Sequence, residues 1–297
     1  MIIVTKLLTE HILPMSDILN YICFKDNEFT QIKNAGPTLL DFGFIHSDST
    51  YDVVKISNRK LFLFDDHYSR FTNSTNFYNL KNYSKDKIIE IANILIEKNN
   101  IDNGFLWLIS WRGIPIDGNP RDIDSCPTHF VAYVKPYYNF NKDNSSTVVL
   151  YKDHFRTPDF SFGQQYKNFS WIDLTLAQRY ADSKNADTAI MMNHNYCITE
   201  GPGFGVGFVF DNEVRVPKND VLKSITIKQV EKICLDKNIS FKYTDINYQE
   251  SFNSSEMFLA STSGGIIPVS NYEGINFKNN NIVKILQDEY KFQENSI

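Results

Sequence analysis

The sequence predicts a protein of mixed α and β structure (α+β) that is organised in two domains. The chain has 297 residues, which exceeds the roughly 100–200 residues of a typical single domain. Hydrophobic residues make up 42% and charged residues 22% of the chain, the balance of a globular protein with a large core. Strand-like and helix-like segments follow one another without strict alternation, which favours α+β over a doubly wound parallel sheet.

Residues 1–136 are expected to form a smaller N-terminal domain that contains both strands and a helix. Four apolar segments have the length and composition of strands, and they cover residues 53–56, 60–64, 105–111 and 129–135. Ser84 is placed to cap a helix, because apolar side chains recur at the helical period from Ile88 to Ile96. The loop 112–126 is rich in Gly, Pro and Asp, and loops of this length in compact domains tend to be functional or disordered.

The polar stretch 137–146 is predicted to link the two domains, and residues 147–297 are predicted to form the larger C-terminal domain. Strands are expected at 147–151, 188–192, 196–199, 206–210, 239–244, 258–261 and 266–269. Helices are expected at about 171–183, 227–236 and 280–292.

Charge and cysteine content exclude several classes of protein. Thirty Lys and Arg against 35 Asp and Glu give a net charge of −5, which argues against binding to nucleic acid through bulk charge. The four cysteines are far apart and match neither a zinc site nor a disulfide framework. No apolar run approaches the roughly 20 residues that a membrane helix needs. We therefore expect a cytoplasmic protein without a metal site, a nucleic-acid partner or a membrane partner.

Two segments have the character of anion-binding turns. In Ser224–Gln229, Thr226 is predicted to be the N-cap of a helix and Gln229 its capping-box partner, and the free N–H groups of a helix start attract anions. In Ser261–Gly265, hydroxyls and unhindered amides stand between two apolar strands. Both patterns are equally typical of an ordinary cap and an ordinary turn, so spacing alone does not decide between the two interpretations.

Three other positions carry groups suited to catalysis. Glu200 stands at the end of a predicted strand, directly before a glycine-rich segment, where backbone approaches a ligand or another strand closely. Lys167 precedes a predicted helix, where burial would make its amine a nucleophile. The run from His46 to Asp52 is dense in titratable and hydroxyl groups. Each of these positions fits a surface role or local turn chemistry equally well.

Four segments, taken in order, carry a resemblance to a known family. They are GFIHSDSTYDVVKISNRKLFLFDDHYSRF (43–71), YKNFSWIDL (166–174), ITEGPGF (198–204) and MFLASTSGGIIPV (257–269). Together they resemble the class IV aminotransferases, which have the fold-type IV architecture and use pyridoxal 5′-phosphate. The first segment looks most like the (R)-selective amine transaminases, beside the D-amino acid and branched-chain aminotransferases. The resemblance extends from about residue 38 to residue 290.

The resemblance implies an enzyme that moves an amino group between an amine or amino acid and a 2-oxo acid. D-amino acids or (R)-amines are the favoured donors, and branched-chain L-amino acids are the next candidates. The same scaffold also serves aminodeoxychorismate-type lyases, and a protein that binds pyridoxal phosphate with little catalysis is a further alternative. Since relatives build their sites at a dimer interface, the resemblance also implies a homodimer.

The same resemblance assigns roles to individual residues. Lys167 matches the lysine that forms a Schiff base with the cofactor and moves the proton. Glu200 matches the acid that pairs with the pyridine nitrogen, and Arg70 matches the arginine that binds the cofactor phosphate. The remaining matches to cofactor-binding positions are Ile225, Thr226, Thr262 and the aromatic Trp171.

On the substrate side, Tyr51 and His46 match residues that line the pocket from the small domain. Arg121 is the nearest candidate for an arginine that accepts a substrate carboxylate, although it fits a surface ion pair with Asp117 or Asp122 equally well. The chain also departs from the family pattern at two positions. Gly205 stands where relatives usually have Asn, and Ile227 stands where they usually have Arg.

Overall fold

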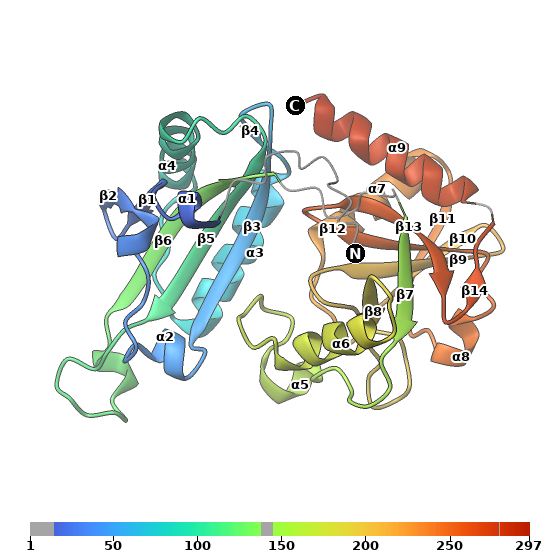
Figure 1. Ribbon diagram of the computed structural model, residues 1–297, viewed down its shortest axis with the longest axis horizontal. Coiled ribbons are helices and arrows are strands. Elements are labelled where there is room, and N and C mark those ends of the chain that lie inside the picture. The colour runs from blue at the N-terminus through green and yellow to red at the C-terminus, as the bar shows by residue number, and fades with distance from the viewer. Residues whose placement is uncertain (1–14, 138–144, 279) are drawn as a thin grey trace, which may run out of the picture.

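The computed structural model describes residues 15–137, 145–278 and 280–297 and places them around two β-sheets (Figure 1). Within these ranges the N-terminal sheet has six strands and the C-terminal sheet has eight. Each part mixes strands with helices, which confirms the predicted α+β class. Most of the predicted linker 137–146 lies outside the described residues. No helix in the described ranges is long and apolar enough to cross a membrane.

The N-terminal sheet is antiparallel and runs in the order β2-β1-β6-β5-β3-β4. Its strands are β1 (Ile22–Lys25), β2 (Glu28–Gln31), β3 (Ser49–Ser57), β4 (Lys60–Leu61), β5 (Gly104–Arg112) and β6 (Thr128–Pro136). Helices α3 (Phe64–Tyr78) and α4 (Lys85–Lys98) cover one face, where alternate strand residues such as Val54, Leu106 and Ala132 join their apolar side chains in a core. The shorter helical segments are α1 (Met15–Ile18), α2 (Phe42–Ile45) and the 3₁₀ turns Ile32–Asn34 and Ile123–Ser125.

The alternation of side chains along β3 sends two neighbouring residues to opposite faces of the sheet. Asp52 points toward α3 and is fully buried there beside His67. Tyr51 points to the other face, where its ring stacks on Trp107 with 5.5 Å between ring centres. Trp107 in turn stacks on Tyr133 of β6 at 5.9 Å. An aromatic row therefore crosses the face of the sheet that α3 and α4 leave uncovered.

The C-terminal sheet runs in the order β11-β10-β9-β12-β13-β7-β8, with β14 beside β13. Its strands are β7 (Ser146–Leu150), β8 (Thr188–Ile190), β9 (Gly205–Phe210), β10 (Glu213–Pro217), β11 (Ser240–Thr244), β12 (Glu256–Ser261), β13 (Gly265–Tyr272) and β14 (Ile275–Asn276). The helices of this part are α5 (Asp159–Phe162), α6 (Ile172–Ser183), α7 (Ile225–Asp236), α8 (Tyr248–Ser251) and α9 (Asn281–Asn295).

Two separate cores lie on the two faces of the central strands of this sheet. Phe258 and Ala260 of β12 pack against apolar side chains of α7 and α9. Met257 and Leu259 of the same strand, together with Phe208 of β9, form the core on the opposite face. This alternation fixes the register of β12. It thereby also fixes the position of the turn after Ser261, which belongs to the candidate site described below.

The predicted strand 60–64 is wrong beyond Leu61. The hairpin itself forms, with positive φ angles of 49° and 64° at Asn58 and Arg59, as tight two-residue hairpin turns require. Leu63 then takes a left-handed conformation with a φ of 53°, and α3 begins at Phe64. The apolar run is shared between a strand end and a helix start, and periodicity cannot divide so short a run.

The predicted N-cap is confirmed for α4 and wrong for α7. Ser84 caps α4 as predicted, since its side chain accepts a hydrogen bond from the Lys87 amide at 3.3 Å. The N-cap of α7 is Ser224, whose Oγ accepts from the Ile227 amide at 3.2 Å. Thr226 lies inside the first turn, so its prediction as the cap is wrong. Two residues that could each serve as a cap compete there, and the extended backbone of Ser224 decides the outcome.

The predicted strand 196–199 is also wrong. Tyr196 has a left-handed φ of 59°, and Cys197 and Ile198 form only isolated bridges to Asn247 and Met192. A left-handed residue turns the chain, which prevents a continuous ladder at this point.

Candidate active site

Lys167 lies on the segment between α5 and α6, where that segment meets the N-terminal sheet. The Thr50 hydroxyl of β3 donates to the Lys167 carbonyl oxygen, and Thr50 also forms a bridge with Asn168. The Lys167 Nζ sits 4.5 Å from the centre of the Tyr51 ring. Burial, with a further contribution from the Arg70 charge, lowers the pKa of the Lys167 amine to about 8. This amine is therefore more readily neutral, and more nucleophilic, than an ordinary lysine.

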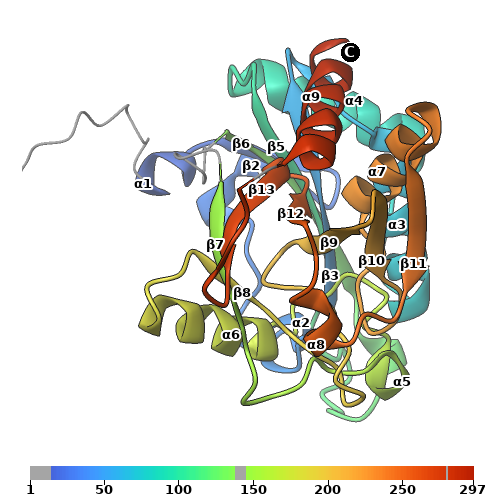
Figure 2. The same ribbon diagram turned by 90° about the vertical axis from the view of Figure 1, so that its right-hand side faces the viewer.

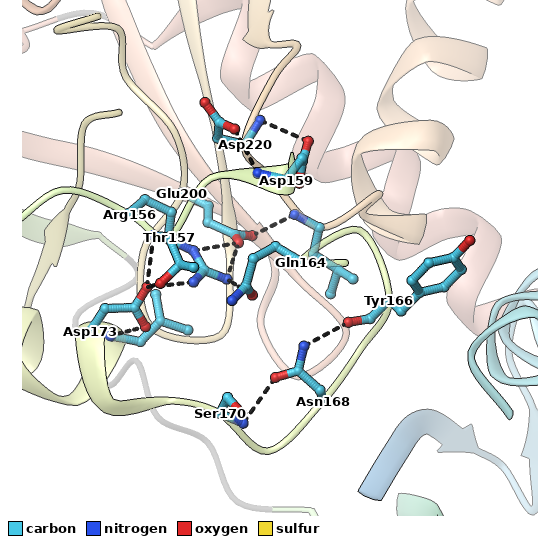
Figure 3. Close-up of polar contacts among 12 residues, drawn as sticks. Arg156, Thr157, Asp159, Gln164, Tyr166, Asn168, Ser170, Asp173, Glu200 and Asp220 are labelled. Carbon is cyan, nitrogen blue, oxygen red and sulfur yellow. Dashed lines mark hydrogen bonds and ion pairs between the residues drawn. The ribbon is translucent and has the colours of Figure 1, made fainter. Parts of the chain in front are cut away.

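Glu200 lies on the connection between β8 and β9, where it is buried and held by a buried arginine (Figure 3). Its Oε1 accepts hydrogen bonds from Nε and Nη2 of Arg156 at 3.1 and 2.9 Å, and its Oε2 accepts from the Leu222 amide at 3.2 Å. Nη1 of the same arginine donates to Asp173 at 2.5 Å. Burial raises the pKa of Glu200, against the opposing effect of the Arg156 charge.

This cluster carries an excess of negative charge. One guanidinium serves two carboxylates, and the Arg156 charge overcomes the effect of burial and lowers the pKa of Asp173. Ionisation of both carboxyl groups would leave the cluster with a net charge of −1, so a cation beside Glu200 would stabilise its ionised form. Gln164 adds a buried amide group whose Oε1 accepts from Arg156 at 3.1 Å, while its Nε2 has no partner among the described residues.

The start of α7 and the turn after β12 supply the groups expected of an anion site. Ile225 and Thr226 occupy the first turn of the helix, so their amides have no acceptor within it. Thr262 lies in the turn that joins β12 to β13, beside Ser261, whose Oγ accepts from the Gly264 amide at 3.0 Å. These residues line the same pocket as Lys167 and Glu200.

Arg70 reaches this pocket from α3, and most of its hydrogen-bonding capacity is already engaged. Its Nε and Nη2 donate to the two carboxylate oxygens of Asp52 at 2.7 and 2.8 Å, and its Nη1 donates to the Lys223 carbonyl at 3.3 Å. Burial acts to raise the pKa of Asp52, but the charges of Arg70 and His67 outweigh it and hold that pKa well below its usual range. One N–H on each terminal nitrogen of Arg70 has no acceptor among the described residues.

The residues assigned to the cofactor line one pocket, whereas two of the residues assigned to the substrate lie outside its lining. A single pocket is lined by Arg70, Lys167, Trp171, Glu200, Ile225, Thr226 and Thr262. Tyr51 joins this group through the Lys167 amine. His46, by contrast, is exposed at the end of α2, with its ring 4.6 Å from that of Phe42. Arg121 is exposed on the loop between β5 and β6 and is not among the residues lining the pocket.

Sequence reasoning missed the partners that hold the main site residues. Arg156 and Gln164 stand in an irregular polar segment with no pattern that marks them. Asp52 did leave a signal, because it occupies the same phase of the strand alternation as the buried Val54 and Ile56. A charged residue at an inward position of a strand indicates a buried partner.

The residues present fit pyridoxal 5′-phosphate. The helix start, Thr262 and the free N–H groups of Arg70 suit its phosphate. The negatively charged cluster around Glu200 suits a protonated ring nitrogen, and the unpartnered Nε2 of Gln164 is a donor that a bound polar ligand would satisfy. The Lys167 amine suits its aldehyde.

Comparison with protein families and sequences gives a consistent result. The family model described as amino-transferase class IV matches residues 49–272. A D-alanine aminotransferase of Staphylococcus aureus (strain N315) is 27% identical over 257 residues, which cover 84% of this chain and 89% of the relative. A putative branched-chain-amino-acid aminotransferase of Methanocaldococcus jannaschii is 21% identical over 275 residues, covering 90% of this chain and 94% of the relative.

Solved structures show the same fold. The branched-chain amino acid aminotransferase of Escherichia coli superimposes with a TM-score of 0.85 at 17% identity, covering 92% of this chain and 94% of that one. The branched-chain enzyme of Thermobaculum terrenum, solved in its PLP form, gives a TM-score of 0.83 at 18% identity, with coverage of 94% and 95%. The two sheets and their helices therefore form the predicted fold-type IV architecture.

Proposed function

The chain belongs to the class IV aminotransferases, which are pyridoxal 5′-phosphate enzymes, and on this premise we propose that it transfers the amino group of a D-amino acid to a 2-oxo acid. The proposal is supported by the D-alanine aminotransferases among its relatives, which align with 84% of the chain. An (R)-amine is the second donor class that we propose, because of the resemblance in segment 43–71.

The observation that carries the proposal is the position of the Lys167 amine. Its pKa is lowered to about 8, and it shares a pocket with the buried Glu200 and with the first turn of α7. A nucleophilic amine, an acid with an excess of negative charge around it, and an anion site are the three groups that this cofactor needs from a protein.

The residues of this chain then divide the work. When bound, the cofactor supplies an aldehyde that holds amines and a ring that accepts an electron pair. Lys167 would hold the cofactor through its side-chain amine, and once a donor amine takes that place, the freed Lys167 amine would accept the proton that leaves the donor Cα. Glu200, fixed by Arg156, keeps the ring nitrogen protonated. The first turn of α7 and Arg70 hold the phosphate, so that the position of the cofactor does not change between the two halves of the reaction.

On the substrate side, we propose that Tyr51 bounds the donor pocket and that the exposed His46 and Arg121 make at most a weak contact at its entrance. We further propose that the working form is a homodimer. Four apolar side chains at or near α2 are exposed by half or more, which supports a covered surface there. They are Leu39 (76%), Leu40 (65%), Phe44 (59%) and Ile45 (50%).

The test is the absorption spectrum of the purified enzyme with single donors. D-alanine, an (R)-aryl amine, L-leucine and L-glutamate are added separately in the absence of an acceptor. We expect D-alanine to convert the bound cofactor to its aminated form and to release one equivalent of the 2-oxo acid. Lys167→Ala should not do so, whereas Lys184→Ala, at an exposed lysine on the surface, should behave as the unaltered enzyme.

Other outcomes would revise the proposal in different ways. Conversion by L-leucine alone would make the protein a branched-chain enzyme. Repeated release of pyruvate without an acceptor would indicate the lyase. Failure of every donor to act on a bound cofactor would indicate a binding protein with little catalysis.

A further inference from the structure

A cavity of about 860 Å³ lies next to the cofactor site, between α3, the end of β10 and the start of α7. Figure 2 looks onto this region with α7 and β10 in front and α3 behind them. The volume is within the range of about 300–1,000 Å³ that is usual for small-molecule sites. We call it the outer cavity. The lining residues that it shares with the cofactor site are Arg70, Tyr166, Gly205, Leu222, Ser224 and Ile225, so the two spaces adjoin there.

Gly205 keeps the connection between the two spaces open. A Cβ at this position would lie 3.1 Å from Cγ1 of Ile227 and 3.6 Å from Cβ of Ser224. Any side chain longer than alanine would therefore extend over the first turn of α7, where the two spaces meet. Since Ile227 is apolar, no charged group from its position closes the opening either.

Three charged side chains around the outer cavity have no ion-pair partner among the described residues, and two of the three are positive. Lys218 and Lys223 line it, both are exposed, and neither has a carboxylate partner among the described residues. Of the two acids on its wall, one is in an ion pair and the other keeps its negative charge. Asp66 pairs with Lys228 at 2.6 Å, and Glu231 accepts a hydrogen bond from the Tyr243 hydroxyl at 3.0 Å. An anion entering the cavity would thus meet two unpaired ammonium groups.

Two further features of the cavity wall suit a ligand, a buried hydroxyl without a partner among the described residues and an aromatic surface. Thr199 is fully buried on the wall of the cavity, and its hydroxyl has no hydrogen-bond partner among the described residues. A buried hydroxyl without a partner is costly unless a ligand satisfies it. The rings of Phe77 and Tyr166, stacked 4.0 Å apart, line the cavity with an aromatic surface.

We propose that the outer cavity is a second ligand site, separate from the cofactor site, which binds a phosphate ester of a planar ring. The phosphate would contact Lys218 and Lys223, and the ring would pack near Phe77 and Tyr166. Two kinds of compound share this chemistry, free vitamin B6 phosphates and nucleoside monophosphates, and the experiment distinguishes them. Binding here requires no turnover, so the proposal goes beyond the proposed function.

The test is calorimetric titration of the holoenzyme after borohydride reduction, which fixes the cofactor in its own site. Pyridoxine 5′-phosphate and adenosine 5′-monophosphate are the probes, and pyridoxine and adenosine are their controls without phosphate. We expect one of the esters to bind with one equivalent per chain and its control to bind about tenfold more weakly or worse. The mass of the reduced protein reports the bond to Lys167 separately. A missing mass shift would therefore count against the proposed function, and a missing second equivalent against the outer cavity.

Three variants locate the binding. Replacing both lysines (Lys218→Ala with Lys223→Ala) should weaken the ester about tenfold and leave the cofactor content unchanged. Thr199→Val should weaken it about threefold or more, through the loss of one buried hydrogen bond. Lys98→Ala, at an exposed lysine on α4, is the matched control and should change nothing. Absence of a second equivalent at about 10 mM ligand, equal affinity for ester and control, or unchanged binding in the double variant would each overturn the proposal.

Discussion

The two sides of the candidate site are built in different ways. On the side of the C-terminal sheet, Arg156, Asp173 and Glu200 are all buried and paired with one another. On the side of the N-terminal sheet, Tyr51 is buried beside Lys167, whereas His46 and Arg121 are exposed. Glu200 and Arg70, both assigned to the cofactor, are thus held by buried partners, one on each side, whereas His46 and Arg121, assigned to the substrate, are not.

This difference has a physical cause and a consequence. Buried charges persist only with partners, because desolvation otherwise costs several kcal/mol for each ion. Each member of the buried cluster is therefore held by the others, and a change at one position disturbs all of them. Exposed side chains on short helices and loops carry no such constraint, so donor preference can change there without loss of the chemistry.

Replacing the central cation should have the largest effect on stability. Arg156→Met leaves Glu200 and Asp173 buried without their partner, and we expect a loss of about 3–5 kcal/mol in the free energy of unfolding, measured by denaturant titration. The control is Arg59→Met, whose side chain is 43% exposed in its pair with Asp102, and it should change the stability by about 1 kcal/mol or less. Equal losses in both variants would contradict a buried cluster that depends on its cation.

Neutralising the acid should separate catalysis from stability. Glu200→Gln keeps the shape but removes the charge that faces the pocket, and kcat should fall about 10²–10³-fold, as for other lost electrostatic groups in active sites. The control is Asp173→Asn, which also loses a charge beside Arg156 but does not line the pocket. It should destabilise the protein while affecting kcat much less. A similar fall in kcat in both variants would show that the cluster acts as a whole.

The pH dependence of cofactor uptake should report the state of Lys167. Since its pKa is lowered to about 8, the amine is mainly protonated at neutral pH, and only the neutral form is a nucleophile. In stopped-flow measurements on the apoenzyme, the rate of covalent uptake should rise about tenfold per pH unit below 8 and level off above it. The nearby charge of Glu200 raises this pKa, so the plateau should begin at a lower pH in Glu200→Gln. A rise that continues to pH 10 would mean an ordinary, solvated lysine.

Two helix caps offer a matched pair, one at the pocket and one away from it. Ser224→Ala and Ser84→Ala each remove a side chain that accepts from a backbone amide, and each should cost about 1 kcal/mol of stability. Only Ser224 precedes the helix start that lines the pocket, so only Ser224→Ala should also weaken cofactor affinity, measured by fluorescence titration. Weaker cofactor binding in Ser84→Ala would mean that the affinity follows global stability.

The smallest effect should come from the exposed loop. Arg121→Ala removes a side chain that lies outside the pocket lining, and KM for the 2-oxo acid should change less than about threefold, since exposed charges contribute little. Tyr51→Ala, at the buried ring beside Lys167, should change KM more. A tenfold rise in KM for Arg121→Ala would mean that this loop closes over the bound substrate.

Local patterns in the sequence predicted much of the secondary structure, because alternation and helical period are properties of neighbouring residues. The strands β5 and β6 and the capped helix α4 follow their patterns closely. These patterns did not predict that the run 60–64 is divided between β4 and α3, because packing against the sheet decides where α3 begins. Strand β10 and the first two strands left no signal strong enough to be predicted.

The amino-acid sequence alone predicted the α+β class and, through four ordered segments, the family and its cofactor. It also singled out Lys167, Glu200 and Arg70. Only the tertiary structure showed that Arg156 holds Glu200 and that Asp52 holds Arg70, or that His46 and Arg121 lie at the surface. The reason is that a buried ion pair is decided by which distant segments pack together and exclude water, and no local pattern records that packing.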